Sequence, residues 1–172
     1  MNVVKNYWLV VDRIRIPDAV DVINNHMKIY HAELLFSGTM YDYMLEQSPL
    51  LINLGHDRQV LESWKRLESF DSSSIIFEID SNVDENKIIE HLQSLLQVRI
   101  EKSPFLLRYY TSNFWLKFSH QLNEMDINTL LGEANAIYWI DQDSQLNMLS
   151  STIRCSDTES ISYSLTSTVF KQ

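Results

Sequence analysis

The side chains that most often bind metals occur in this chain at spacings that fit no metal site. His26 and His31 lie five residues apart, so on a helix they would point about 140° away from each other. The segment Asp80–Asp84 begins like a calcium-binding loop, but such a loop needs glycine where Glu85 stands and a bidentate glutamate where His91 stands. We therefore expect no metal ligands in this chain.

Nucleophiles and phosphate-binding loops are equally poorly represented. The chain has 3 glycines, Gly38, Gly55 and Gly132, and they lie too far apart for a nucleophile elbow, a Walker loop or a dinucleotide fingerprint. Cys155 lies in a polar segment with no histidine close to it in the sequence, so a free thiol is the better interpretation. We expect no catalytic residues, no cofactor and no enzymatic activity, which favours a binding protein by elimination.

Composition and charge limit the partners further. The chain has 172 residues, of which 45% are hydrophobic and 11% aromatic, enough for the core of one domain. Its 14 basic and 23 acidic residues give a net charge of −9, which disfavours nucleic acids and anionic membranes. The apolar segment 7–11 is too short for a signal peptide or a membrane span, and one cysteine suits a reducing compartment. We expect a cytoplasmic protein without membrane insertion.

Strand and helix patterns alternate along the chain and predict an α/β fold with a mixed β-sheet flanked by helices. Short apolar segments rich in β-branched and aromatic residues predict strands at 7–11, 33–36, 49–54, 73–79, 97–101, 105–110 and 136–140. Apolar residues three or four apart predict helices at 17–30, 57–67, 84–96, 114–122 and 127–131, with a short helix or turn at 40–47. We expect a tight hairpin turn at 102–104.

The composition changes after Asp141, which divides an α/β domain at 1–141 from an extension at 142–172. In the extension 12 of 31 residues are Ser or Thr, and helical periodicity is lost. Because apolar residues remain, the extension needs a binding surface, either on a partner, as an extended arm, or on this domain, as a final strand within 160–170. We expect its apolar residues and their neighbours to include partner-binding residues, with the candidates Tyr138, Trp139, Tyr163, Leu165 and Phe170.

The order of several motifs over residues 7–140 resembles the domain of unknown function found in type VI secretion effector chaperones, also called adaptors. The matching segments are Leu9-Val10-Val11-Asp12, Leu35-Phe36-Ser37-Gly38-Thr39, Pro49-Leu50-Leu51-Ile52, His91-Leu92-Gln93 and Arg108-Tyr109-Tyr110. The chain departs from the pattern at Leu50, which replaces a tryptophan, at Thr111-Ser112, which replaces Asp-Pro, and at Gly132-Glu133-Ala134, which replaces Gly-Pro. The motif positions, expected to be mainly structural, are Phe36, Gly38, Pro49, His91, Leu92, Arg108 and Tyr110.

The resemblance implies a cytoplasmic bacterial adaptor that is not an enzyme. Such a protein binds a cognate secreted effector and helps to load it onto the spike tip protein of the secretion apparatus. Two alternatives stay open: an immunity or regulatory protein that binds and inhibits a toxin, and a small-molecule-binding α/β domain with a deep cleft. Independently of the resemblance, Arg108 follows an apolar strand, so we expect it to be partly buried and held by a carboxylate or by backbone carbonyls.

Overall fold

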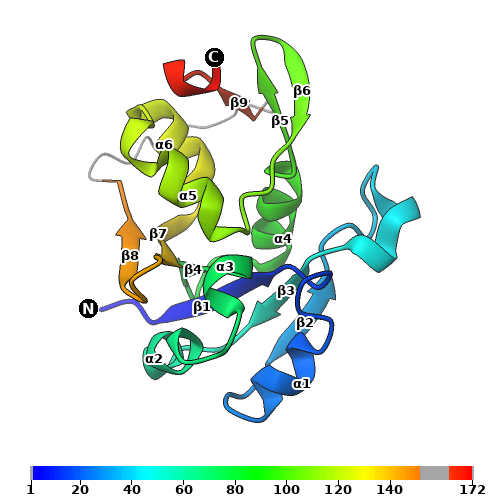
Figure 1. The fold of residues 1–172 in the computed structure, drawn as a ribbon, viewed down its shortest axis with the longest axis vertical. Helices are drawn as coiled ribbons and strands as arrows, with labels where there is room; N and C mark the ends of the chain where they lie inside the picture. Colours follow the sequence, from blue (N-terminus) through cyan, green and yellow to red (C-terminus); the bar gives the residue numbers. More distant parts are fainter. Residues whose placement is uncertain (1, 152–162, 172) are drawn as a thin grey trace.

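In a computed structural model, which describes residues 2–151 and 163–171, the chain forms two sheets with helices packed around them (Figure 1). The main sheet has six strands in the order β2-β3-β1-β4-β7-β8, and all neighbouring pairs run antiparallel. A second sheet of three strands has the order β6-β5-β9, with β6 antiparallel and β9 parallel to β5. The strands are β1 (Lys5–Val11), β2 (His31–Leu34), β3 (Leu50–Asn53), β4 (Ser74–Asp80), β5 (Gln97–Ile100), β6 (Ser103–Leu106), β7 (Ala134–Ile140), β8 (Leu146–Leu149) and β9 (Ser164–Leu165).

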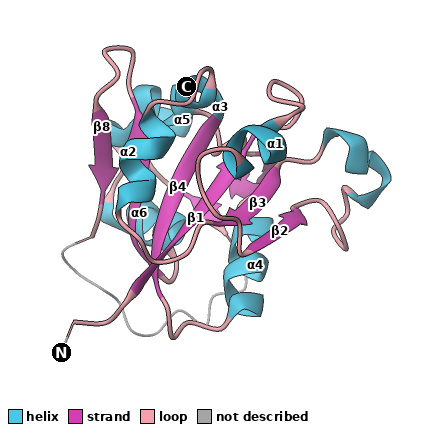
Figure 2. Ribbon diagram, turned by 90° about the horizontal axis from the view of Figure 1, so that it is seen from below, coloured by secondary structure: helices cyan, strands magenta, loops and turns pink. Residues whose placement is uncertain are grey.

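Helices cover both faces of the main sheet, as Figure 2 shows from below. The α-helices are α1 (Ala19–Asn24), α2 (Gln59–Lys65), α3 (Phe70–Ser73), α4 (Glu85–Ser94), α5 (Ser112–Phe118) and α6 (Glu124–Leu131). Three short 3₁₀ helices are η1 (Asp42–Gln47), η2 (Ser119–Gln121) and η3 (Thr168–Lys171). The α/β class expected from the sequence is therefore confirmed. Among the residues that the structure describes, no helix is long and apolar enough to cross a membrane.

The central strand β1 explains why its sequence is continuously apolar. Side chains alternate between the two faces of a strand, so Trp8 and Val10 face one core, and Leu9 and Val11 face the other. Helices α4, α5 and α6 contribute buried residues to the first core, and α1, α2 and α3 contribute to the second. A strand covered on both faces can bury every side chain without alternating with polar ones.

Several predicted elements have different bounds in the structure. Helix α1 ends at Asn24, so Met27 and Tyr30 follow it in a loop and do not continue its apolar face. Strand β2 begins and ends two residues earlier than predicted. Strand β6 also begins and ends earlier than predicted. The hairpin turns at Glu101 and Lys102, whose φ angles of 49° and 72° reverse the chain before Ser103. The one-turn helix α3 and the edge strand β8 are absent from the prediction.

The part of the C-terminal extension that the structure describes packs on the domain. Strand β9 joins the second sheet and not the main one, and Leu165 within it is 2% exposed. The predicted strand at 160–170 is thus reduced to two residues followed by the turn of η3, and its first three positions lie outside the described residues. Cys155 also lies outside them.

Candidate protein-binding groove

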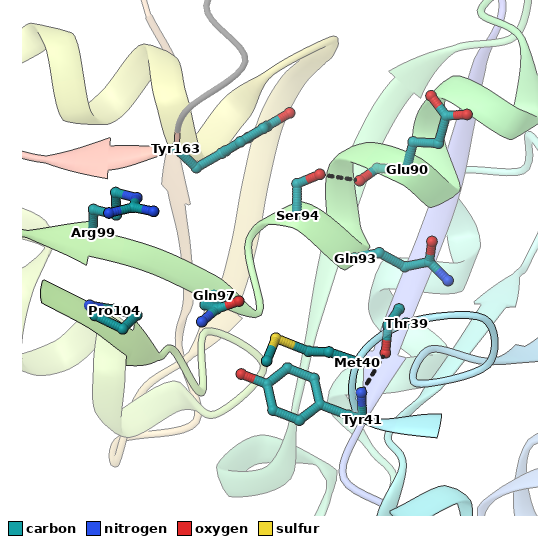
Figure 3. Close-up of a pocket in the computed structure, with 10 residues that line it drawn as sticks. All are labelled: Thr39, Met40, Tyr41, Glu90, Gln93, Ser94, Gln97, Arg99, Pro104 and Tyr163. Carbon is teal, nitrogen blue, oxygen red and sulfur yellow. Dashed lines mark hydrogen bonds between the residues drawn. The ribbon is translucent and has the colours of Figure 1, made fainter. Parts of the chain in front are cut away.

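A groove of about 700 Å³ lies between the loop that follows β2, helix α4 and the β5–β6 hairpin. Figure 3 shows its walls: Met40 and Tyr41 come from the loop, Gln93 from α4, and Arg99 from β5. We call this hollow the α4 groove. Its full lining is Thr39, Met40, Tyr41, Glu90, Gln93, Ser94, Gln97, Arg99, Pro104 and Tyr163.

The loop wall of the groove is built by the Leu-Phe-Ser-Gly-Thr segment. Phe36 is buried at 3% exposure, and its N–H donates to Ser48 Oγ at 2.9 Å. Gly38 then adopts a φ of +73°, which glycine reaches without steric cost, and its N–H donates to Asp42 Oδ1 at 2.8 Å. Thr39 Oγ1 accepts from the N–H of Tyr41 at 3.1 Å, so this motif positions the residues that line the groove.

The helix wall is fastened to the same loop by one side chain. Gln93 Nε2 on α4 donates to the carbonyl of Ser37 at 2.9 Å and to that of Leu35 at 3.3 Å. Two backbone acceptors held by one amide fix the distance between α4 and the loop. The Gln93 side chain therefore connects the two walls of the α4 groove.

Exposed apolar side chains occur in the two segments that border the groove, although only Met40 among them lines it. On the loop, Met40 is 62% exposed and Tyr43 is 80% exposed. On the hairpin, Phe105 is 48% and Leu106 is 47% exposed, in a strand that has no buried residue. Large exposed apolar residues gathered around a hollow are typical of surfaces that bind other proteins.

The groove changes in charge along its length. At one end, a neighbouring hollow that shares Glu90 and Gln93 also contains Glu33 and Glu85. His31 lies between these two carboxylates, with Nε2 3.2 Å from Glu33 and 3.4 Å from Glu85. Arg99 lines the other end. An extended segment lying in the groove would meet acidic groups at one end and a cation at the other.

Two tyrosine hydroxyls lie at the groove. Burial raises the pKa of the Tyr41 and Tyr163 hydroxyls from their usual value of 10.0, so both remain neutral donors near neutral pH. Neutral hydroxyls and amides are suited to hydrogen bonding with a peptide backbone.

His91, on α4, connects Tyr163 at the groove to helix α6. Its Nδ1 is 2.9 Å from the Tyr163 hydroxyl, and its Nε2 is 3.1 Å from the carbonyl of Leu130 in α6. Burial lowers its pKa from 6.5 to about 4, which keeps the ring neutral at physiological pH. Gly132 has no side chain and so leaves space for this ring. A Cβ at that position would lie 2.4 Å from the ring and would clash with it.

The other motif positions lie mainly in the core. Leu92 is fully buried, Tyr110 is 5% exposed and Pro49 is buried, whereas Gly38 lies on an exposed turn. Arg108 Nη2 donates to Asp12 Oδ2 at 2.8 Å, which confirms the expected carboxylate partner. The two residues belong to separate matched motifs, and the fold brings them together. The side chain of Asp12 is 3% exposed but that of Arg108 is 50% exposed, so the arginine is only half buried.

The five residues expected to bind a partner do not form one surface. Tyr138 and Trp139 are 3% and 4% exposed, because β7 is covered on both faces, so the expectation that they lie in an exposed patch is wrong. Leu165 is buried against the domain as well. Tyr163 and Phe170 are half-buried, and Tyr163 reaches the α4 groove.

The protein is thus an α/β domain with helices on both faces of the main sheet. Its α4 groove is bordered by segments that carry exposed apolar residues. The chain belongs to the family described as Domain of unknown function (DUF4123), whose model matches residues 7–128. The matched region includes every groove residue except Tyr163. Neither the curated proteins nor the solved structures contain a significant match to this chain.

Sequence reasoning identified the motif loop but missed the residues that complete the groove. Gln93 stands within the matched His-Leu-Gln segment, and its position after the buried Leu92 was a usable signal. Arg99 and Pro104 had no such signal, since their role depends on where the hairpin is placed. Asp126 was also missed, although it is fully buried, because its acceptor role involves residues 40 positions later.

Proposed function

We propose that this protein is an adaptor that binds a secreted effector of the type VI secretion system and helps to load it onto the spike tip protein. It acts by binding and not by catalysis. Membership of the DUF4123 family, which is associated with such adaptors, supports the proposal. The observation that carries it is the α4 groove, one wall of which is made by the motif loop and which is bordered by two segments that carry exposed apolar residues.

The groove suits an extended segment of the effector. Apolar side chains of the segment would pack on Met40 and Tyr43 along one rim and on Phe105 along the other. The carboxylates of Glu33, Glu85 and Glu90 favour a basic residue at one end of that segment.

Capture of the neighbouring gene products tests the proposal. The tagged full-length protein is co-expressed with the products of adjacent genes, and the complex is recovered by affinity purification. We expect the wild type to recover an effector, and Met40→Ser with Tyr43→Ser, or Phe105→Ser with Leu106→Ser, to reduce recovery at least tenfold. Met148→Ser is the matched control, because Met148 is 56% exposed on the distant edge strand β8.

Two results would overturn the adaptor proposal. One is recovery of no adjacent gene product by a folded wild-type protein. The other is recovery of a toxin through its catalytic domain with loss of the toxin's activity, which would identify an inhibitor. Equal recovery by the groove variants and Met148→Ser would reject the α4 groove as the binding site.

A further inference from the structure

The C-terminal segment 163–171 lies along the domain as an added strand and turn. Figure 1 shows it, in red, between the β5–β6 hairpin and helix α6. Strand β9 runs parallel to β5, and the N–H of Arg99 donates to the carbonyl of Tyr163 at 2.8 Å. This arrangement is the geometry by which many domains bind an extended peptide, adding it to the edge of a sheet.

The buried carboxylate of Asp126, in α6, accepts hydrogen bonds from the backbone of this segment. Asp126 is 0% exposed, and its carboxylate accepts from the N–H of Thr166 at 2.9 Å and from the N–H of Ser167 at 2.8 Å. The hydroxyl of Ser167 also donates to it, and that of Thr166 lies 3.3 Å away. Four donors from two consecutive residues thus satisfy a charge that burial would otherwise make costly.

Two apolar contacts flank this polar clamp. Before it, Leu165 is 2% exposed within the core made by α4, α5 and β5. After it, the Phe170 ring lies 4.9 Å from that of Phe118 and stacks on Phe114 at 6.4 Å. The segment is therefore recognised by a pattern: a leucine, two hydroxyl residues with free N–H groups, two further residues and an aromatic ring.

The acceptor and the segment belong to different parts of the chain. Asp126, Phe114 and Phe118 lie within the region matched by the family model, which ends at residue 128. The segment begins 35 residues after that region (163 against 128). The region matched by the family model thus supplies the Asp126 carboxylate and the aromatic rings of Phe114 and Phe118. The segment outside it supplies the N–H groups, hydroxyls and Phe170 ring that they contact.

We propose that the surface of β5, α5 and α6 that contacts residues 163–171 is a peptide-binding slot, filled in cis by these residues and open in trans to a partner protein's segment with the same pattern. The clamp contacts backbone N–H groups and small hydroxyls, so any extended segment with Leu-Thr/Ser-Ser and an aromatic residue three positions later supplies the same donors. The slot is separate from the α4 groove and does not depend on the proposed function. Tyr163 contacts both, so exchange of the segment would also reshape one wall of the groove.

The test converts the internal segment into a separate ligand without removing any residue. A recognition sequence for a specific protease is inserted within residues 152–162 of the full-length protein, which is then cut. A fluorescently labelled peptide of residues 163–171 is added, and its binding is measured by anisotropy before and after the cut. We expect the cut protein to stay folded, to exchange its own segment, and to bind the peptide at least tenfold more tightly than the uncut protein, in which the linked segment competes at high effective concentration.

Changes in the peptide test the pattern without touching the domain. Leu165→Asp and Phe170→Ala peptides should bind at least tenfold more weakly, whereas Thr168→Ala should bind like the original, because Thr168 is exposed. Unfolding of the cut protein, failure to exchange, or equal binding of the Leu165→Asp peptide would overturn the proposal. Dimers that form by mutual exchange would assign the slot to a second copy of this chain and reject a different partner.

Discussion

Gly132 packs against the His91 ring so closely that no side chain fits at this position. Gly132 has a φ of +55°, and an added Cβ would lie 2.4–2.6 Å from the His91 ring. Gly132→Ala should therefore lower the free energy of unfolding by about 2–4 kcal/mol, from the steric conflict and the backbone strain together. Urea denaturation followed by circular dichroism measures it.

Gly38→Ala is the matched control, because it isolates backbone strain. Gly38 has a φ of +73°, but nothing lies within 4 Å of the position of an added Cβ. Its loss should be about 1–2 kcal/mol. Equal losses at the two glycines would contradict a steric role for His91.

Neutral His91 makes the stability of the fold depend on pH. Its pKa is 6.5 in the unfolded chain and about 4 in the folded protein, so between these values the unfolded state binds more protons. Stability is therefore complete above about pH 6.5 and falls as pH decreases toward 4. From pH 7 to pH 5 this one residue should cost about 2 kcal/mol. His91→Gln should flatten the profile in that window when unfolding is measured at several pH values; an unchanged slope would contradict the assignment.

In the Asp12–Arg108 ion pair the arginine is half exposed, which determines how much the pair contributes to stability. A buried pair loses 3–5 kcal/mol when one member is removed and an exposed pair at most about 1 kcal/mol. When Arg108 is removed, the Asp12 carboxylate still accepts the hydrogen bond from the N–H of Ile14, at 3.0 Å. Arg108→Ala should therefore cost about 1–2 kcal/mol in chemical denaturation. Arg15→Ala, at a longer 3.8 Å contact to the same carboxylate, should cost less, and the reverse order would contradict this account.

At the scale of elements, the hairpin turn between β5 and β6 uses residues poorly suited to it. Glu101 and Lys102 both have positive φ, as a two-residue type I′ turn requires, and Asn-Gly is the sequence that this turn favours. Replacing the two residues with Asn and Gly should raise the free energy of unfolding by about 1 kcal/mol. Thermal denaturation measures it, and Glu101→Gln is the control that leaves the strain in place. A lower melting temperature would contradict the turn assignment.

The elements that sequence patterns predicted well are those whose own residues decide them. Strand β1 is a continuous apolar segment and helix α4 carries apolar residues at helical spacing, and both are present at nearly the predicted positions. Strand β8 has two polar or exposed positions in four residues and is a strand because it pairs with β7, which no local pattern encodes. Helix α3 is a single turn, too short to show a period.

The candidate site divides in the same way. The Leu-Phe-Ser-Gly-Thr loop was identifiable as a motif, and its glycine has the left-handed conformation that only a few residue types adopt easily. The acceptor role of Asp126 was not predictable, because its partners are 40 and 41 residues away and a carboxylate in the first turn of a helix has an ordinary explanation. Long-range polar contacts leave no periodic trace in a sequence.

For the molecule as a whole, the net charge of −9 has a kinetic consequence. If the effector segment is basic, as the carboxylates of the α4 groove favour, the charges steer association. The association rate should then fall at least several-fold between 50 and 500 mM salt, while the dissociation rate changes less. Stopped-flow or surface binding measurements with the captured effector test this. A rate independent of salt would contradict electrostatic recognition.

The alternation of strand and helix patterns predicted the class of this molecule correctly, but not the arrangement of its sheets. Whether a strand runs parallel or antiparallel to its neighbour depends on which strands meet. Here α1 connects β1 to β2 and α2 connects β3 to β4, but in each case another strand lies between the two, and α4 leads from the main sheet to the second sheet. Alternation of strand and helix therefore did not produce adjacent parallel strands. The single parallel pair among the described residues, β5–β9, joins segments more than 60 positions apart.

The position of β1 at the centre of the main sheet also bears on how the chain assembles during synthesis. Within the main sheet β1 precedes the other strands in the sequence. It pairs with β3 and then with β4, after which β7 joins β4 and β8 joins β7. Each later strand of the main sheet except β2 therefore pairs with a strand translated before it, whereas β2 pairs with β3, which is translated after it. The sheet can therefore grow outward in the order of translation, and β1 has both of its neighbours once β4 has been made.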